Sequence, residues 1–534
     1  MLLVDLITVW AGFLLIWILV SRGVPVFQEL IRDMTDFFME KALGPGADLF
    51  EGRDGSGTVA WMMHGMLWTC VGGAFTFIGM WMAHEPDAIA SLSSIYYEPA
   101  TSTVQNAAYG ASSGGILMLL IGAGLHINGR LSGSGVASET NAVLVSYAFS
   151  MSIFLGFVSD HTDSTWGGYL ESAAGIISTL VIVAILANHL LTLGRSTNST
   201  VMPSQWLIIG GLALPLIMCA ADFVLNLHDA IHESMTVLPM LASGLAVALY
   251  VAPFAAGAPL WSRTLAGTTV FMTFVTLSPI GIDGLAQTSM GDAAMLSVLY
   301  AASMIPLLAT AGNVMQTARS NWGKATGNSG STAVMIGMIM LVGSGIGHLF
   351  VGSDAHSMNE IQHLSSSMNL LFLWGAMGMI AWGGVIVCFP IAAGRSLDSN
   401  ETSRTTMWLV ASGTTLAFLF SMGSSMISAA YDAAAVANDS IDPELIDTMA
   451  ATATMDSLAS IAFYVVSIAS ILMMINMIRG NFSGAPLGTD EPAGQSANRI
   501  ALTPGSTTIR QLIAAGAGAD TEIDVICDSC DEEE

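Results

Sequence analysis

The sequence predicts an all-α integral membrane protein with about thirteen transmembrane helices. Of its 534 residues, 53% are hydrophobic and only 10% are charged, whereas a soluble domain carries about 25% charged residues. The mean hydropathy is +0.66. The apolar residues form blocks of about 20, the length that spans a bilayer as a helix. These blocks are helices because membrane-spanning strands would alternate in polarity over about ten residues.

The predicted helices follow one another along the whole chain. In order, they cover residues 3–22, 58–82, 108–127, 141–160, 170–194, 205–227, 234–256, 264–281, 292–318, 332–352, 367–393, 406–428 and 456–478. Residues 24–44 carry apolar side chains at helical spacing with charges between them. This pattern predicts an amphipathic helix on the membrane surface.

The basic residues predict the orientation. The fourteen Lys and Arg residues are Arg22, Arg32, Lys41, Arg53, Arg130, Arg195, Arg263, Arg319, Lys324, Arg395, Arg404, Arg479, Arg499 and Arg510. With thirteen helices, all of them lie on one side of the membrane, and the loops on the other side carry only acidic charges. Because basic loops stay in the cytoplasm, we expect the N-terminus outside and the C-terminus in the cytoplasm of a multi-pass cell-membrane protein.

Three regions follow from these elements. Residues 1–57 hold an N-terminal transmembrane helix and the amphipathic segment, residues 58–480 form the membrane bundle, and residues 481–534 form an acidic, flexible cytoplasmic tail. The tail contains Cys527 and Cys530 in a C-D-S-C motif. We interpret them as an exposed pair without a role, because a metal or redox site needs more ligands around it.

The net charge of −26 restricts the partners and the setting. There are 40 acidic residues and 14 basic ones, and Lys41 and Lys324 are the only lysines. Nucleic acid is excluded as a partner, since phosphate contact needs clustered Lys and Arg. Dense carboxylates are tolerated where salt screens them, so the composition indicates a halophilic source. The partner that the composition does indicate is the lipid bilayer.

Histidines are the candidate cofactor and metal ligands. His64 begins a H-G pair early in residues 58–82 and is compatible with an axial heme ligand, because the glycine leaves room for the macrocycle. Packing at the membrane boundary is the alternative. His228 and His232 are four residues apart, share a helical face, and with Asp229 and Glu233 are candidates for a metal site. An exposed polar cap is the alternative there.

His356 and His363 are seven residues apart, or two helical turns, ahead of residues 367–393, and are candidate heme ligands. The other histidines at helix ends are expected to be solvated. They are His84, His126, His161, His189 and His348.

The order of several segments resembles subunit I, the catalytic subunit, of the heme-copper oxidases, a superfamily that includes the nitric oxide reductases. The resemblance covers roughly residues 58–480. L-H-D-A-I-H-E-S-M-T-V-L-P (227–239) is similar to the family's copper-binding stretch, and M-I-P-L-L-A-T-A-G-N-V-M-Q-T (304–317) to its Pro-containing helix. C-F-P-I-A-A-G (388–394) resembles the end of its helix with several His. Residues 413–423 and 458–472 look like its last two helices.

The copper ligands of that family are missing from the matching positions. The family uses one His ahead of the Leu-Pro and an adjacent His pair two helices later. The first position falls at Ala230, between His228 and His232, and the pair is replaced by S-P-I-G-I-D-G (278–284). The resemblance therefore implies that copper is absent and that reduction of dioxygen or nitric oxide is not predicted.

The heme ligands also depart from the family. The two ligands of the long helix fall at Met368 and Leu370, and the His-Gly of the family's second helix falls at Ser113–Gly114. The Arg pair that binds heme propionates is replaced by residues 429–432. What the resemblance leaves is a heme-binding electron-transfer subunit, using His64, His356 or His363, or a scaffold subunit of a respiratory complex. The alternative from another class is a multi-pass transporter for ions or small solutes.

Overall fold

A computed structural model describes residues 2–20, 54–85, 87–89, 99–162, 164–196, 200–280, 290–351, 358–437 and 448–487. Within these ranges every regular element is a helix, and the only β-type pairing is an isolated bridge between Arg395 and Pro486. The helices are α1 (Leu2–Ile18), α3 (Ser56–His84), α4 (Thr101–Ser132), α5 (Glu139–Asp160), α6 (Ser164–Gly194), α7 (Pro203–Leu225), α8 (Asp229–Ala256), α9 (Arg263–Val275), α10 (Met290–Ser320), α11 (Trp322–Gly327), α12 (Ser329–Val351), α13 (Met358–Leu370), the π-helix η6 (Leu371–Gly378), α14 (Met379–Ala393), α15 (Asn400–Ala437) and α16 (Thr448–Ser483).

The all-α, multi-pass prediction is confirmed, although the count of thirteen is not. Eleven helices in the described part are long and apolar enough to cross a bilayer. The other two predicted spans correspond to α1, with 17 residues, and α9, with 13 residues. At 1.5 Å per residue α9 is about 20 Å long, short of the roughly 30 Å of a hydrocarbon core.

The break at the end of α9 has a local cause. Thr276 has extended backbone angles and ends the helix, and its hydroxyl donates to the Met272 carbonyl at 2.6 Å. Pro279 lacks an amide hydrogen and disfavours helical angles in the residue before it. The chain then continues without helix through Leu277 and Ile280, which are both buried.

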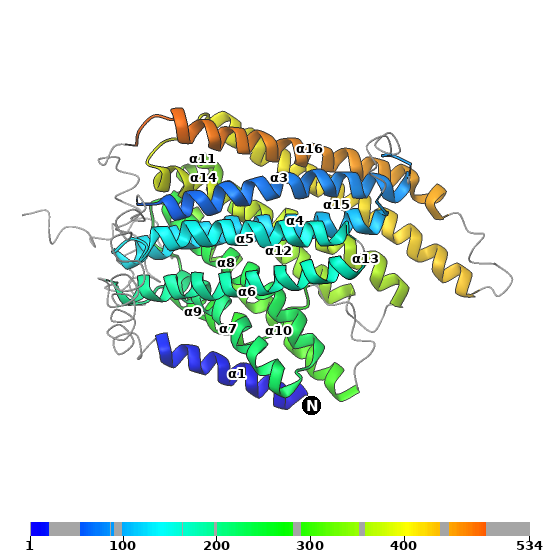
Figure 1. Cartoon of the computed structure of the whole chain (residues 1–534), viewed down its shortest axis with the longest axis horizontal. Coiled ribbons are helices and arrows are strands. Elements are labelled where there is room, and N and C mark those ends of the chain that lie inside the picture. Colours follow the sequence, from blue (N-terminus) through cyan, green and yellow to red (C-terminus); the bar gives the residue numbers. More distant parts are fainter. Residues whose placement is uncertain are drawn as a thin grey trace, which may run out of the picture.

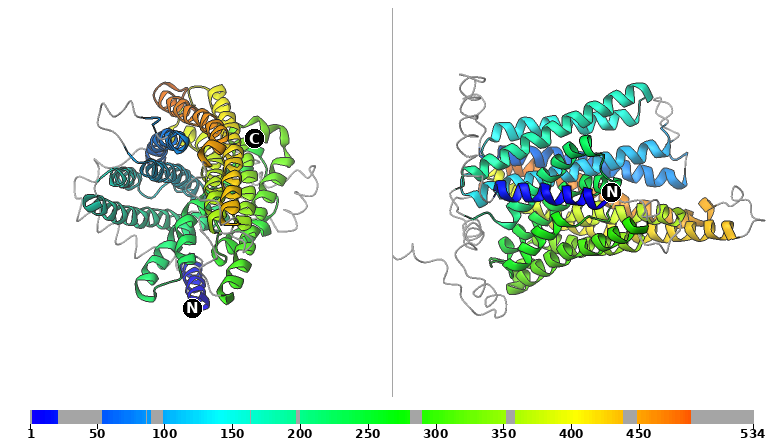
Figure 2. Two further views of the ribbon diagram at one scale, coloured as in Figure 1. Left: turned by 90° about the vertical axis from the view of Figure 1, so that its right-hand side faces the viewer. Right: turned by 90° about the horizontal axis from the view of Figure 1, so that it is seen from below.

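The long helices lie side by side (Figure 1). Three of them are the most buried. Of their most apolar stretches, α4 buries 78%, while α8 and the continuous α13–η6–α14 helix each bury 89%. By contrast, α1 is peripheral (Figure 2), where Phe13 stacks on Phe274 of α9 at 5.2 Å. The predicted N-terminal helix is therefore an addition to the side of the bundle.

Glycines bring α3 and α4 into backbone contact. A Cβ atom added to Gly115 would lie 2.6 Å from the Thr69 amide nitrogen, and one added to Gly65 would lie 2.9 Å from the Gly115 carbonyl oxygen. Gly72 is equally close to the backbone of Ser112. The hydrophobic effect does not drive helices together within lipid, so their association depends on van der Waals packing. Small residues favour it because they allow the helix backbones to approach closely.

The described basic residues all lie at one end of the bundle, which we call the cationic end. They are Arg130, Arg195, Arg263, Arg319, Lys324, Arg395, Arg404 and Arg479. Two of these residues connect neighbouring segments at this end. Arg195 donates to the Ala137 carbonyl at 2.8 Å, and Arg479 pairs with Asp398 at 3.8 Å. The opposite end, which we call the acidic end, is where α3, α5 and α7 finish (Figure 1).

Cysteine labelling tests which end faces the cytoplasm. In a variant lacking the native cysteines, we expect Asp87→Cys at the acidic end to react with an impermeant maleimide on intact cells. Ser134→Cys at the cationic end should react only after permeabilisation, because basic loops are retained inside. Both positions are exposed, so reagent access is matched. Labelling of Ser134→Cys in intact cells would contradict the predicted orientation.

Two predicted regions fall partly outside the described residues. The amphipathic segment 24–44 and the C-D-S-C motif lie outside them. The boundary of the tail shifts, because α16 continues to Ser483 and the next residues pair with the loop after α14. Ser396 donates to the Ala485 carbonyl at 2.9 Å, and Leu487 donates to the Gly394 carbonyl at 3.0 Å. The bundle therefore extends to residue 487, beyond the predicted end at 480.

Candidate functional site

The His64 side chain packs against α5. Its Nδ1 lies 3.2 Å from the Ser146 hydroxyl, and its ring meets the Tyr147 ring edge-on at 4.5 Å. The space that Gly65 leaves is filled by the α4 backbone. The α4 side of α3 thus has no room for a macrocycle, and on the α5 side Ser146 and Tyr147 already contact the imidazole. Heme ligation by His64 stays a prediction that this packing does not favour.

His228 and His232 lie at the start of α8, at the acidic end. His228 is the N-cap residue, and its Nδ1 accepts the Ala230 amide hydrogen at 3.2 Å. His232 is exposed one turn later. In the part of the chain that the structure describes, no three His, Cys, Asp or Glu side chains are grouped closely enough to hold a metal. The pair therefore lacks a third ligand there, and its metal site stays a prediction.

The remaining predicted ligands cannot be placed in a site. His356 lies outside the described residues. Residue 363 belongs to α13, but its side chain is not among those described. The heme predictions for His356 and His363 therefore stay untested.

Side chains fill the space beside two of the positions that match the family's heme-binding residues, Gly114 and Met368. A Cβ atom on Gly114 would lie 2.7 Å from the Ile153 side chain of α5. Met368 of α13 is buried and covers Gly347 of α12, with its terminal methyl 3.0 Å from a Cβ placed there. A macrocycle beside either position would have to displace these side chains.

Three histidines expected to be solvated are buried instead. His126, His189 and His348 are 7%, 0% and 4% exposed. The helices extend past the predicted apolar segments, and neighbouring helices extend with them, so the helix ends remain covered. His348 Nε2 lies 3.0 Å from Asn369 Oδ1, whereas His126 Nε2 and His189 Nε2 have no hydrogen-bond partner among the described residues.

A buried polar network joins α4, α6 and α7 near the cationic end. Asn128 Nδ2 donates to the His189 carbonyl at 3.0 Å, and Gln205 Nε2 donates to Asn128 Oδ1 at 2.9 Å. Gln205 also donates to the Ser132 hydroxyl and accepts from the Met202 amide. Its members are almost fully buried. Sequence reasoning missed the network, because its residues come from three helices.

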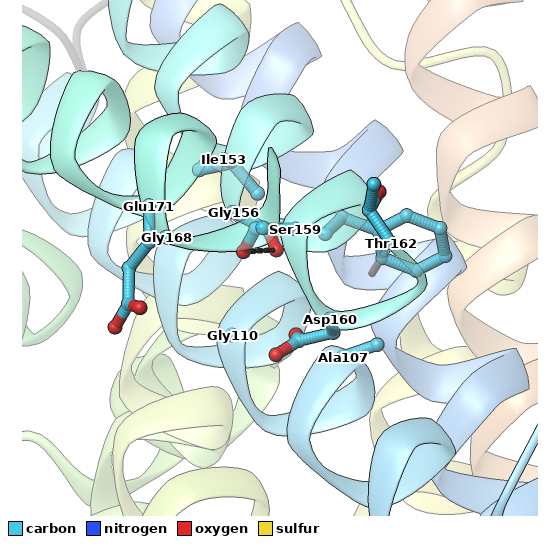
Figure 3. A pocket seen from close by; sticks show the side chains of 11 residues that line it. Ala107, Gly110, Ile153, Gly156, Ser159, Asp160, Thr162, Gly168 and Glu171 are labelled. Carbon is cyan, nitrogen blue, oxygen red and sulfur yellow. Dashed lines mark hydrogen bonds between the residues drawn. The ribbon is translucent and has the colours of Figure 1, made fainter. Parts of the chain in front are cut away.

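A pocket opens near the acidic end between α4, α5 and α6 (Figure 3). Its volume is about 460 Å³, and we call it the outer pocket. Its lining residues are Ala107, Gly110, Ile153, Gly156, Phe157, Ser159, Asp160, Thr162, Gly167, Gly168 and Glu171. Asp160 was noted in the sequence only as a loop charge, and Glu171 was not singled out. No sequence motif marks this pocket, since it depends on glycines of separate helices facing one hollow.

Comparison with known proteins adds no relative. No protein-family model matches the sequence, and no curated protein sequence matches it either.

Proposed function

We propose that the chain is a degenerate relative of subunit I of the heme-copper oxidases that serves as a scaffold within or beside a respiratory complex. The observation that carries this proposal is the closure of the ligand positions. Ile153 fills the space at Gly114, and Met368 stands in place of a heme-ligating histidine and packs on α12. A bundle of this order with a packed interior can hold neighbouring subunits without carrying a redox centre.

The packing favours a scaffold over an electron carrier for a physical reason. A heme needs an axial ligand and an open, shaped space, and both must occur at the same place. Ser113, Met368 and Leu370 stand where the family has its histidine ligands, and the Ile153 and Met368 side chains occupy space beside them. Methionine is suited to this because its flexible thioether fills irregular gaps in a packed interior.

Spectroscopy of protein purified without stripping tests the proposal. We expect no reduced-minus-oxidised heme spectrum, no copper by elemental analysis, and migration with a respiratory complex on native gels. Deleting the gene should reduce the amount of that complex. A stoichiometric heme that is lost in His363→Ala and retained in His232→Ala would support the electron-transfer alternative. An unchanged complex after deletion would contradict the scaffold.

The transporter alternative has one structural observation in its favour. Transporters place substrate sites where transmembrane helices are interrupted, and α9 ends after 13 residues in a buried extended segment. Reconstitution into liposomes separates the two proposals. A scaffold should leave proton and sodium gradients intact, whereas dissipation of either gradient would favour transport.

A further inference from the structure

We propose that the outer pocket binds an organic cation that joins a protonated amine to an apolar body. The inference does not depend on the scaffold role. It rests on the shape of the pocket, on the polarity of its side chains and on the distribution of charge over the bundle.

Glycines create the hollow. A Cβ atom added to Gly110, Gly156 or Gly168 would have no atom within 4 Å other than its own local backbone. The volume of about 460 Å³ falls in the range of small-molecule sites, which runs from about 300 to 1,000 Å³. It is far larger than a bare ion needs, and the described residues hold no metal-binding group. The size therefore indicates an organic ligand.

The polar side chains of the pocket can only accept hydrogen bonds when the carboxylates are ionised. Ser159 uses its hydroxyl hydrogen on the Gly156 carbonyl at 2.7 Å, and Thr162 uses its own on the Val158 carbonyl at 2.6 Å. Asp160 and Glu171 are the only ionisable residues in the lining (Figure 3). These side-chain oxygens can be satisfied by a ligand that donates hydrogen bonds. An ammonium group is such a ligand, because it has hydrogen-bond donors and no acceptor.

The two carboxylates of the pocket have His161 as a basic neighbour. The Asp160 carboxylate is attracted by His161 and repelled by Glu171, and the eight described Lys and Arg residues lie at the other, cationic end of the bundle. The C-terminal end of α5 and the N-terminal end of α6 both border the pocket, so their opposite helix dipoles offset each other there. A bound cation would relieve this repulsion, whereas an anion would increase it.

The opposite wall of the pocket is apolar and rigid. Ile153 and Ala107 are buried, and the Phe157 ring is held by an edge-on contact with Phe75 at 4.7 Å and by stacking on His161 at 5.0 Å. This wall favours an apolar or aromatic body beside the charged group. The two halves together select an amphipathic amine over a simple hydrated cation.

Fluorescence titration of the purified full-length protein tests the site. The probe is dansylcadaverine, which carries one primary ammonium, and its matched neutral control is dansyl butylamide. We expect saturable binding of the amine and binding of the neutral analogue weaker by about tenfold, which corresponds to about 1.4 kcal/mol. Asp160→Asn with Glu171→Gln should weaken amine binding by about the same factor.

A steric pair completes the test. Gly156→Leu places a side chain in the hollow and should abolish amine binding, while Gly175→Leu on α6, which is equally free of neighbours and outside the lining, should leave it unchanged. Equal thermal unfolding midpoints of the two variants would show that the fold is intact. Amine binding that is absent in the native protein, or unchanged in Gly156→Leu, would overturn the proposal.

Discussion

Replacing Gly115 with leucine is expected to prevent stable folding. The added Cβ would lie 2.6 Å from the Thr69 amide nitrogen and 2.9 Å from the Gly65 carbonyl oxygen. These are backbone atoms, so no rotamer change can relieve the contact and α3 and α4 must separate. Inserting side chains into packed cores costs about 1–3 kcal/mol even where side chains can move. We therefore expect a loss of at least about 3 kcal/mol of stability here.

The measurement is the yield and the thermal unfolding midpoint of detergent-purified protein by fluorescence-detected size-exclusion chromatography. Gly110→Leu is the control on the same helix, because Gly110 is exposed and has no atom within 4 Å of its added Cβ. It should behave like the native protein. If both variants eluted as native protein with equal midpoints, the close approach of α3 and α4 would be refuted.

The transmembrane helices were predictable because hydropathy alone determines which segments can enter lipid. The segment predicted at 234–256 is α8, Asp229–Ala256, and the segment at 108–127 is α4, Thr101–Ser132. Both helices are longer than predicted at their polar ends. Hydropathy marks the part inside the hydrocarbon, whereas the helix continues through the interface, where polar side chains are tolerated.

The grouping of basic residues was also predictable, because each crossing reverses the chain. An even number of predicted membrane crossings separates Arg130 from Arg263, so both residues lie at the same end of the bundle. The shortness of α9 was missed, since the apolar run 264–281 continues past Thr276. Hydropathy does not distinguish a buried extended segment from a helix.

The candidate site was much less predictable from the sequence. A histidine four residues from another, or beside a glycine, is compatible with ligation, but burial and neighbours decide its role. Gly65 allows the close approach of α4. The sequence alone does not show whether a glycine accommodates a neighbouring helix or a cofactor. The outer pocket and the Asn128 network depend on which faces of three helices meet, and this is a property of packing that no local pattern encodes.

Asn128→Leu is expected to destabilise the bundle because it removes the hydrogen bonds that Asn128 makes in the network. Leucine has the same branched skeleton of side-chain heavy atoms as asparagine, but it would remove the bonds of 2.9 and 3.0 Å that Asn128 makes with Gln205 Nε2 and the His189 carbonyl. Leaving buried polar groups unpaired costs about 1–3 kcal/mol. A lower thermal unfolding midpoint is the expected result. Asn106→Leu, the same change at an exposed position of α4, should leave the midpoint unchanged.

A double-mutant cycle tests whether Asn128 and Gln205 stabilise the protein together or independently. If the 2.9 Å bond between Asn128 and Gln205 is the coupling, Asn128→Leu with Gln205→Leu should cost less than the sum of the single changes, because each single change already breaks this bond. Independent sites add to within about 0.5 kcal/mol. Additive losses from these two residues would mean that each side chain acts alone, and the buried amides would then be separate helix-packing contacts.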